Sequence, residues 1–381
     1  MYLHVPFCEE PCQFCSFHRV RFEESLATAY FHALREEIRR YGVEGFRFDS
    51  LSVGGGTPTV LPSELAETLR LVRSVWPIRA LSVETNPSHL TPRTLDLLRE
   101  SGVQRLSVGV QTFRDDVLAA MGRERYGSSA RIRSLLGSAT PVFPTLNVDL
   151  IFGFPGQTAD MSASDAAVVR ELGIPQVTFY PFMRSLRTRA TLAWRMGSGP
   201  SAPLDELFRT IRGSLGPEYR HSSAWCFSRR DGQPSDEYIV ERSQYAGLGA
   251  GSFGYIGDTL WATTFSILRY IEAVRRGGHP IVLSRRYSRH ERAAHRVLME
   301  FFGGAVHPVS IAATGGLLAA PPLAAGLGLL RAWGALRYDR GVLRTTERGQ
   351  YLAVLLMKEF FQAVNEFRET CRAASQGNEG I

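Results

Sequence analysis

The chain opens with Met1-Tyr-Leu-His-Val-Pro-Phe-Cys-Glu-Glu-Pro-Cys-Gln-Phe-Cys15, in which Cys8, Cys12 and Cys15 follow the spacing C-x3-C-x2-C. Three thiolates on one short loop can bind three irons of a cubic iron–sulfur cluster and leave the fourth iron without a protein ligand. An open metal position is typical of a catalytic site rather than a structural one. The opening stretch therefore predicts a cluster that binds a further molecule at its open iron.

Two other uses of these cysteines have weaker support in the sequence. A disulfide framework needs paired cysteines in a small secreted chain, whereas this chain has five cysteines in 381 residues, and Cys226 and Cys371 stand alone. A zinc site would need a fourth Cys or His at a short spacing, for which His18 is the candidate.

The composition is that of an ordinary globular chain, except that almost all of its positive side chains are arginine. The apolar fraction is 44%, the net charge is +7, and Lys358 is the only lysine. The arginines are scattered and form no basic stripe with aromatic residues, so we expect no nucleic-acid partner. The apolar stretch 317–330 is interrupted by Pro321-Pro322 and is too short for a bilayer, so we expect no membrane partner. With neither a disulfide pattern nor a leader segment, we expect a cytoplasmic protein.

Strand-like and helix-like segments alternate through the first half of the chain. The pattern predicts strands at 1–6, 51–53, 80–84, 105–110, 145–151 and 176–180, helices at 23–41, 62–75 and 92–101, and a helix after residue 111. Such alternation gives a parallel sheet with crossover helices, and β/α barrels place their active sites at the carboxyl ends of the strands. We therefore predict an α/β fold in which residues 1–280 form a partial (β/α)6 barrel with an extension.

Glycine or polar residues close several of these predicted strands. The run Gly54–Gly56 presents backbone N–H groups without side chains, which allows a ligand to approach closely. Glu84, Gln111 and Asp149 each end a strand with a side chain that can hydrogen-bond a ribose or an amino acid moiety. Each residue alone could be a structural cap, but together they predict a ligand site at one edge of the sheet.

Several motifs, in order along the chain, resemble those of the HemN-like branch of radical S-adenosylmethionine (SAM) enzymes. The resemblance covers about residues 1–280. The motifs are Tyr2-Leu-His-Val-Pro-Phe-Cys8, Val53-Gly-Gly-Gly-Thr-Pro-Thr59, Val83-Glu-Thr-Asn-Pro87, Ser107-Val-Gly-Val-Gln-Thr-Phe113, Asn147-Val-Asp-Leu-Ile-Phe-Gly-Phe-Pro-Gly-Gln157 and the glycine-rich stretch 245–258.

The resemblance implies a role for each motif residue. Cys8, Cys12 and Cys15 would ligate a [4Fe–4S] cluster, whose open iron would bind SAM and whose electron would cleave SAM to methionine and a 5′-deoxyadenosyl radical. The other residues of this first SAM site would be Tyr2, Phe14, Gly55, Gly56, Thr57, Glu84, Gln111, Arg123 and Asp149. Phe14 would lie near the adenine, and Arg123 would pair with a SAM carboxylate. A second SAM would lie near Pro181 and Phe253.

Departures from the family pattern decide the predicted reaction. Coproporphyrinogen dehydrogenases carry another cysteine two positions after the triad, where this chain has Phe17, and an N-terminal extension before the first strand, where this chain begins. The haem-chaperone relatives carry a His-Asn…Tyr-Trp stretch, and the corresponding residues 236–245 lack that His and Trp. These departures favour the class of C-methyltransferases and cyclopropanases.

In that class, a second SAM donates one carbon to an sp2 carbon of a small natural product, here expected to be unsaturated or aromatic. The alternatives are an oxidative decarboxylase of the coproporphyrinogen III type and a haem chaperone. The resemblance also implies an electron donor such as flavodoxin or ferredoxin, and it allows a partner methyltransferase.

The sequence pattern changes after residue 280. It predicts helices at 291–302 and 349–370 and, between them, a hairpin at 338–345 that turns at Asp339-Arg-Gly341. Residues 281–372 resemble the small, mostly helical, winged domain of HemN relatives, which we expect to form a lid, and 373–381 would be a flexible tail. The substrate candidates are polar and aromatic residues late in the barrel: Tyr180, His221, Trp225, Asp236, Glu237 and Tyr238.

Overall fold

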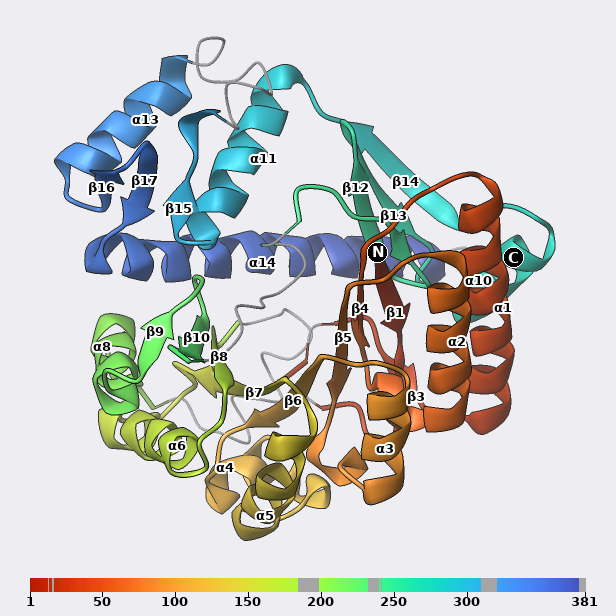
Figure 1. Ribbon diagram of the computed structural model, residues 1–381, viewed down its shortest axis with the longest axis horizontal. Helices are drawn as coiled ribbons and strands as arrows, with labels where there is room; N and C mark the ends of the chain where they lie inside the picture. Colours follow the sequence, from red (N-terminus) through yellow and green to blue (C-terminus); the bar gives the residue numbers. More distant parts are fainter. Residues whose placement is uncertain are drawn as a thin grey trace.

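A curved, open β-sheet with helices on its outer face forms the lower part of the molecule, and the C-terminal elements lie above it (Figure 1). The computed structural model describes residues 1–183, 199–231, 240, 242–309 and 321–376, except positions 13 and 16, and it describes side chains as far as residue 372.

The largest sheet has nine strands in the order β11-β1-β4-β5-β6-β7-β8-β10-β9. Its strands are β1 (Tyr2–Val5), β4 (Ser50–Gly55), β5 (Ala80–Thr85), β6 (Arg105–Gln111), β7 (Thr145–Phe152), β8 (Gln176–Pro181), β9 (Tyr219–His221), β10 (Cys226–Arg229) and β11 (Gly247–Leu248). The strands from β11 to β8 run parallel, and β10 and β9 continue the sheet antiparallel. The six predicted barrel strands are confirmed, and the barrel is partial, with β11 and β9 as its edge strands.

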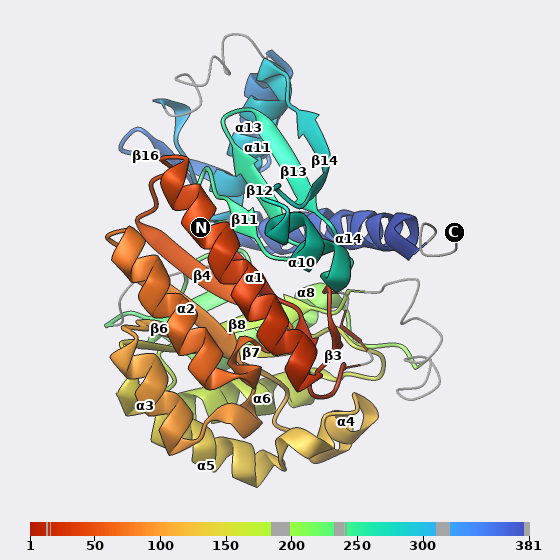
Figure 2. The same cartoon turned by 90° about the vertical axis from the view of Figure 1, so that its right-hand side faces the viewer.

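Crossover helices cover the convex face of this sheet, as Figure 2 shows for α1, α2, α3 and α5. The helices of this part are α1 (Glu24–Val43), α2 (Pro62–Val75), α3 (Pro92–Glu100), α4 (Asp115–Ala120), α5 (Ser129–Ala139), α6 (Ala159–Glu171) and α8 (Leu204–Leu215). Single 3-10 turns are η1 (Pro58–Val60), η2 (Pro87–His89), η3 (Glu124–Tyr126) and η4 (Thr140–Val142). Proline occupies the first position of α2 and α3, where a helix does not need the missing N–H. The helices predicted at 23–41, 62–75 and 92–101 are therefore confirmed.

Among its described residues, the C-terminal part contains two small antiparallel sheets and four helices. One sheet joins β12 (Phe253–Ile256), β13 (Thr259–Thr263) and β14 (Ile281–Arg286), and the other joins β15 (Ala305–Val306), β17 (Val342–Thr345) and β16 (Leu336–Asp339). The helices are α10 (Ile267–Arg275), α11 (Arg289–Phe302), α13 (Pro321–Ala332) and α14 (Glu347–Gln376). The predicted hairpin is confirmed, since β16 and β17 pair around Arg340 and Gly341, which have φ angles of 50° and 86°.

The long helix α14 connects the two edge regions of the open barrel (Figure 1). Near its start, Tyr351 lies 5.8 Å from Phe208 of α8, measured between ring centroids. Farther along, the indole N–H of Trp225, just before β10, donates to the backbone of α14 at 3.4 Å. Near its end, Phe367 lies 5.9 Å from Phe253 of β12. A single helix therefore bridges the side of β9 and β10 and the side of β11 and β12.

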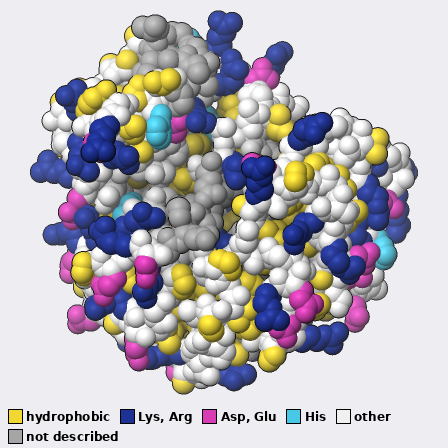
Figure 3. Space-filling model, viewed as in Figure 1, with side chains coloured by type: hydrophobic (Ala, Val, Ile, Leu, Met, Phe, Trp, Pro, Cys, Tyr) yellow, Lys and Arg dark blue, Asp and Glu magenta, His cyan; other side chains and the backbone are white. Residues whose placement is uncertain are grey.

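Two expectations about the surface can be compared with the structure. Within the described ranges, no helix has the length and apolarity required to cross a membrane. On the face shown in Figure 3, arginines are spread out and acidic side chains lie among them. This distribution agrees with the scattered arginines of the sequence and shows no basic stripe on that face.

Candidate functional site

The three predicted cluster ligands lie on a loop at the carboxyl end of β1. This loop leaves β2 (Phe7–Cys8) and returns to pair with it in parallel at β3 (Val20–Arg21). Cys8 is buried, Cys12 and Cys15 are half-buried, and all three thiols are free. Burial, together with the neighbouring Cys15 and Cys12, raises the pKa of Cys8 to about 12. Burial also raises the pKa of Cys15. The thiols therefore lie close enough to influence each other's ionisation.

The donors around the thiols fit an iron–sulfur cluster. In the part of the chain that the structure describes, no three His, Cys, Asp or Glu side chains converge to hold a single metal ion. A cubic cluster binds each thiolate at a different iron, so its ligands need not converge on one point. Arg123 Nη1 donates to Cys12 Sγ at 3.0 Å, and Thr57 Oγ1 donates to Cys8 Sγ at 3.8 Å. Such donors stabilise the thiolate form that binds iron.

Arg123 ties the cysteine loop to the barrel. Its side chain is buried, and Nη2 donates to the carbonyl oxygen of Gly109 in β6. The guanidinium carbon lies 4.3 Å from the centre of the Tyr126 ring, and the Tyr126 hydroxyl donates to the carbonyl of Glu10 at 3.0 Å. Arg123 thus contacts the loop both directly and through Tyr126. Its contact with a SAM carboxylate stays a prediction.

The glycine run at the end of β4 is packed too tightly for any side chain. A Cβ on Gly54 would lie 2.5 Å from Glu84 Oε1, and a Cβ on Gly56 would lie 2.6 Å from the carbonyl oxygen of Phe7. Gly55 has a φ of 124°, and its N–H donates to Glu84 Oε2 at 3.2 Å. Glu84 itself is exposed at the end of β5. The run therefore brings bare backbone and an accessible carboxylate next to the cysteine loop.

Gln111 has a strained backbone at the end of β6. Its φ is 78°, in the left-handed region that L-residues avoid, and the β6–β7 register shifts between Gly109 and Gln111. Among the described residues, Arg340 in the hairpin turn is the only other non-glycine residue with positive φ. Left-handed backbone costs about 1–2 kcal/mol, and such strain tends to occur at functional sites. The strain supports the prediction that Gln111 contacts a ligand.

Asp149 is held by its own sheet. Its carboxylate accepts hydrogen bonds from Ser107 Oγ and Asn147 Nδ2, both at 2.7 Å. Burial raises the pKa of Asp149, while Arg105 and these hydrogen bonds oppose the increase. The network fixes the Asp149 carboxylate within β7. Its contact with SAM stays a prediction.

The remaining predicted cofactor residues occupy different parts of the sheet edge. The Tyr2 hydroxyl lies 3.0 Å from His4 Nδ1 on β1. Phe14 packs against a small apolar group separate from the main core, formed by Val117, Met121, Ile151, Phe154 and Phe182. Pro181 ends β8, whereas Phe253 begins β12 beyond the opposite edge strand, so the two residues predicted for a second SAM come from opposite sides of the sheet.

The substrate candidates that the structure describes belong to the core under α14. Trp225 is buried, and its ring lies 5.1 Å from Tyr180 and 5.2 Å from Phe361. His221 lies 5.1 Å from Phe227, and burial lowers its pKa to about 4. These side chains pack α14 onto the barrel. Asp236, Glu237 and Tyr238 lie outside the described residues.

Sequence reasoning missed a buried carboxyl that anchors the glycine-rich stretch. Glu37 of α1 accepts from the Tyr270 hydroxyl at 2.6 Å and from the Gly249 N–H at 3.0 Å. Burial raises its pKa to about 7, although both hydrogen bonds act to lower it. A glutamate between the apolar residues Leu34, Ile38 and Tyr41 of a predicted helix is the signal that could have identified it. Sequence reasoning also did not single out His4, Arg368 and Arg372 as candidate site residues, and it considered His18 only as a zinc ligand.

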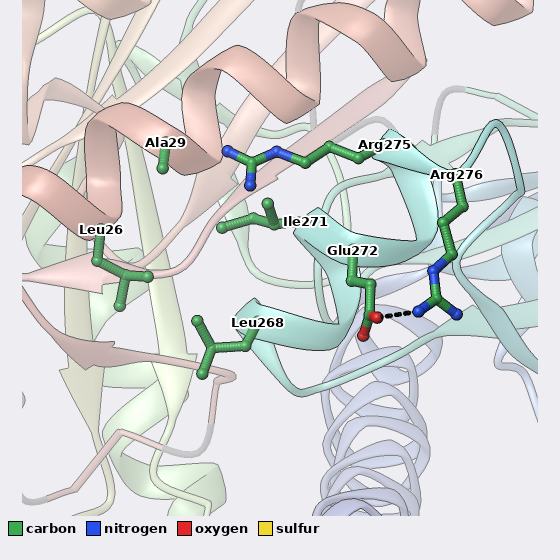
Figure 4. Close-up of a pocket in the computed structure, with 7 residues that line it drawn as sticks. All are labelled: Leu26, Ala29, Leu268, Ile271, Glu272, Arg275 and Arg276. Carbon is green, nitrogen blue, oxygen red and sulfur yellow. Dashed lines mark ion pairs between the residues drawn. The ribbon is translucent and has the colours of Figure 1, made fainter.

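A cavity of about 420 Å³ lies apart from these residues, between α1 and α10 (Figure 4). Its lining comprises Leu26, Ala29, Leu268, Ile271, Glu272, Arg275 and Arg276. A second, polar cavity of about 270 Å³ borders the cysteine loop at Glu9 to Pro11 and the segment around Arg123 at Gly122, Glu124 and Arg125. The second cavity adjoins the candidate site, whereas the first contains none of the predicted cofactor residues.

Comparison with known proteins places the site in a family. The model of the radical SAM superfamily matches residues 2–164. The heme chaperone HemW of Bacillus subtilis is 28% identical over 306 residues, or 73% of this chain and 76% of that protein. HemW of Mycobacterium tuberculosis is 30% identical over 280 residues, which are 68% of this chain and 70% of that protein. The oxygen-independent coproporphyrinogen III oxidase of Escherichia coli is 28% identical over 310 residues, or 74% and 66%.

The fold agrees with these similarities. The solved structure of the E. coli coproporphyrinogen III oxidase HemN, a radical SAM enzyme, superposes with a TM-score of 0.77 at 24% identity, covering 94% of this chain and 88% of that one. Radical SAM enzymes use a [4Fe–4S] cluster and SAM, so membership of this family implies both cofactors. On this evidence, the chain belongs to the HemN-like family of radical SAM enzymes.

Proposed function

We propose that this enzyme cleaves SAM at the cysteine loop and directs the resulting radical to a tetrapyrrole that carries carboxylates. The observation that carries the proposal is the 3.0 Å hydrogen bond from Arg123 to Cys12 Sγ, because Arg123 also donates to Gly109 and so joins the cysteine loop to β6 of the barrel. The tetrapyrrole class is supported by the relatives, whose names refer to haem and to coproporphyrinogen III. This proposal departs from the natural-product substrate that the sequence favours.

The residues around the loop would position SAM for reductive cleavage. A [4Fe–4S] cluster held by Cys8, Cys12 and Cys15 would supply the electron that cleaves SAM to methionine and a 5′-deoxyadenosyl radical, and flavodoxin or ferredoxin would be the external donor. Glu84 would accept from the amino group of SAM beside the bare backbone of Gly55. The apolar group around Phe14 would exclude water from the radical.

A second candidate reaction is one-carbon transfer from a second SAM near Pro181 and Phe253. Phe17 favours it, because coproporphyrinogen dehydrogenases carry a cysteine at this position. The side chain of Phe17 is 38% exposed, and the guanidinium of Arg368 lies over its ring at 4.9 Å. A cysteine there would add a thiol beside the cluster, whereas phenylalanine adds an apolar surface.

Product analysis separates these reactions. The reconstituted enzyme would be incubated without oxygen with reductant, SAM and coproporphyrinogen III, and 5′-deoxyadenosine, S-adenosylhomocysteine and carbon dioxide would be measured. 5′-Deoxyadenosine with carbon dioxide supports oxidative decarboxylation, and 5′-deoxyadenosine with S-adenosylhomocysteine supports one-carbon transfer. Stoichiometric haem binding without SAM cleavage would contradict the enzymatic proposal and indicate a haem carrier.

A further inference from the structure

His18 is a buried histidine with no hydrogen bond to its ring. It lies in the cysteine loop, between Cys15 and β3, and 3% of its surface is exposed. Its ring stacks on His4 at 5.8 Å and meets Phe265 at 5.0 Å, measured between centroids. Neither ring nitrogen has a partner among the described residues. Since buried polar groups are nearly always hydrogen-bonded, this ring can take a hydrogen-bond partner that the described residues do not supply.

His18 also marks the contact between the cysteine loop and the glycine-rich stretch. A Cβ on Gly251 would lie 2.4 Å from His18 Cδ2, so the stretch presses directly on the ring. Gly251 has a φ of 78°, which a side chain would also disfavour. A ligand bound to His18 would therefore touch both segments that the family resemblance associates with SAM.

Two arginines near the end of α14 lie beside this contact between the cysteine loop and the glycine-rich stretch. Arg368 and Arg372 are one helical turn apart and share a face of the helix. The guanidinium carbon of Arg368 lies 4.9 Å from the Phe17 ring centre and 5.5 Å from that of Phe253. Arg372 lies 5.9 Å from the Phe265 ring centre, and its Nη2 donates to the carbonyl oxygen of Phe17 at 3.2 Å. Both guanidinium groups thus stack on aromatic rings beside His18.

Neighbours within α14 orient these guanidinium groups. Arg368 Nη1 donates to Asn365 Oδ1 at 2.8 Å, and Arg372 Nη1 donates to Glu369 Oε1 at 2.7 Å. Arg372, Arg368 and Arg19 all lower the pKa of His18, after the larger effect of burial. Three guanidinium groups therefore lie near His18, one of them paired with Glu369, and cations in such a position attract an anion.

We propose that His18, Arg368 and Arg372 form a binding site for a carboxylate of the substrate, between the cysteine loop and the end of α14. A guanidinium fork matches the two oxygens of a carboxylate, and an imidazole N–H adds a third donor. Phe17, Phe253 and Phe265 would contact the flat ring that carries the carboxylate. The inference rests on the proposed function, because the carboxylate is that of the tetrapyrrole.

Comparing an acid with its ester tests this site. Binding of coproporphyrin III and of its tetramethyl ester to the full-length, cluster-loaded protein would be measured by fluorescence quenching in one mixed solvent. The variants are Arg368→Met/Arg372→Met, the charge-preserving Arg368→Lys/Arg372→Lys, and His18→Ala. Arg348→Met is the matched control on the first turns of α14. Iron content and 5′-deoxyadenosine formed without substrate would report on the cluster and on SAM.

The wild type should bind the acid about tenfold or more tightly than the ester, since each charge-assisted hydrogen bond to a carboxylate is worth about one order of magnitude. The double methionine variant should lose this preference, because its binding of the acid weakens while its binding of the ester stays unchanged. The double lysine variant should keep part of it, and His18→Ala should lose part of it. Arg348→Met should behave as the wild type.

Three results would overturn the inference alone: a wild type that binds acid and ester equally, variants that keep the wild-type preference, or variants that weaken acid and ester to the same extent. Loss of SAM cleavage without substrate in the arginine variants would also overturn it, because the carboxylate bound there would then be that of SAM. A wild type that binds neither porphyrin would contradict the proposed function as well.

Discussion

The barrel and helix α14 contribute residues to the candidate site in different ways. In the barrel, Glu84, Gln111 and Asp149 lie on the consecutive parallel strands β5, β6 and β7, so short motifs and the sheet register bring them together. Helix α14 reaches the cysteine loop through Arg372 and Phe17, which are 355 residues apart in the chain. Under the proposed function, local motifs would therefore hold the cofactor, and long-range packing would form the substrate side.

The largest expected effect comes from removing a thiol in the barrel. Cys12→Ala should abolish both the cluster and all formation of 5′-deoxyadenosine, because the remaining two thiols cannot hold a site-differentiated cubic cluster. Iron and sulfide content and product chromatography would measure this. Cys226→Ala, at a buried cysteine of β10 outside the cysteine loop, is the matched control and should keep both properties. Cleavage of SAM by Cys12→Ala would contradict the assignment of the loop.

The next effect concerns the packing of α14 on the barrel. Trp225→Ala removes a buried ring that contacts both Tyr180 and Phe361, and it should lower the free energy of unfolding by about 3–5 kcal/mol. Glu347→Ala removes an ion pair with Arg212 that is exposed on both sides, and it should cost less than about 1 kcal/mol. Denaturant unfolding would measure both. Equal costs would show that the aromatic contacts do not fix the helix.

A smaller effect depends on pH and concerns the anchor of the glycine-rich stretch. The pKa of Glu37 rises from 4.5 to about 7 on folding, so the folded state binds the proton more tightly. This contribution to stability is complete below about pH 4.5 and is lost as pH rises to about 7. Glu37→Gln should remove the dependence, which is on the order of 1–3 kcal/mol.

Unfolding of both proteins at pH 4.5 and 7.5 would check this. Relative to the wild type, Glu37→Gln should gain stability between the two pH values. The exposed neighbour Glu36→Gln should follow the wild type at both. If Glu37→Gln also parallels the wild type, the buried carboxyl is not the titrating group.

The smallest predicted effect lies in the strained turn of β6. Since Gln111 has a φ of 78°, Gln111→Gly should be about 1 kcal/mol more stable than Gln111→Ala. Both variants should raise KM for SAM, because both lack the amide. Thermal unfolding and initial rates at varied SAM would measure this. A more stable alanine variant would show that the backbone is unstrained, and an unchanged KM would remove Gln111 from the SAM site.

Much of the barrel could be predicted from the sequence because its information is local. Short apolar strand runs, helix-starting prolines such as Pro62 and Pro92, and glycine runs each act within a few residues, and the predicted strands and helices follow them. The left-handed backbone of Gln111 could not be predicted, since it results from a register shift against β7. The stacking of Arg368 on Phe17 depends on how α14 crosses the barrel, which no local pattern records.

The central claim is that the cysteine loop holds a cluster whose open iron binds SAM, and electron paramagnetic resonance of the reduced, reconstituted protein tests it most directly. Our account predicts the signal of a reduced [4Fe–4S] cluster that changes shape when SAM is added and that is absent from Cys12→Ala. A protein without such a signal, or a signal that SAM leaves unchanged, would contradict the account.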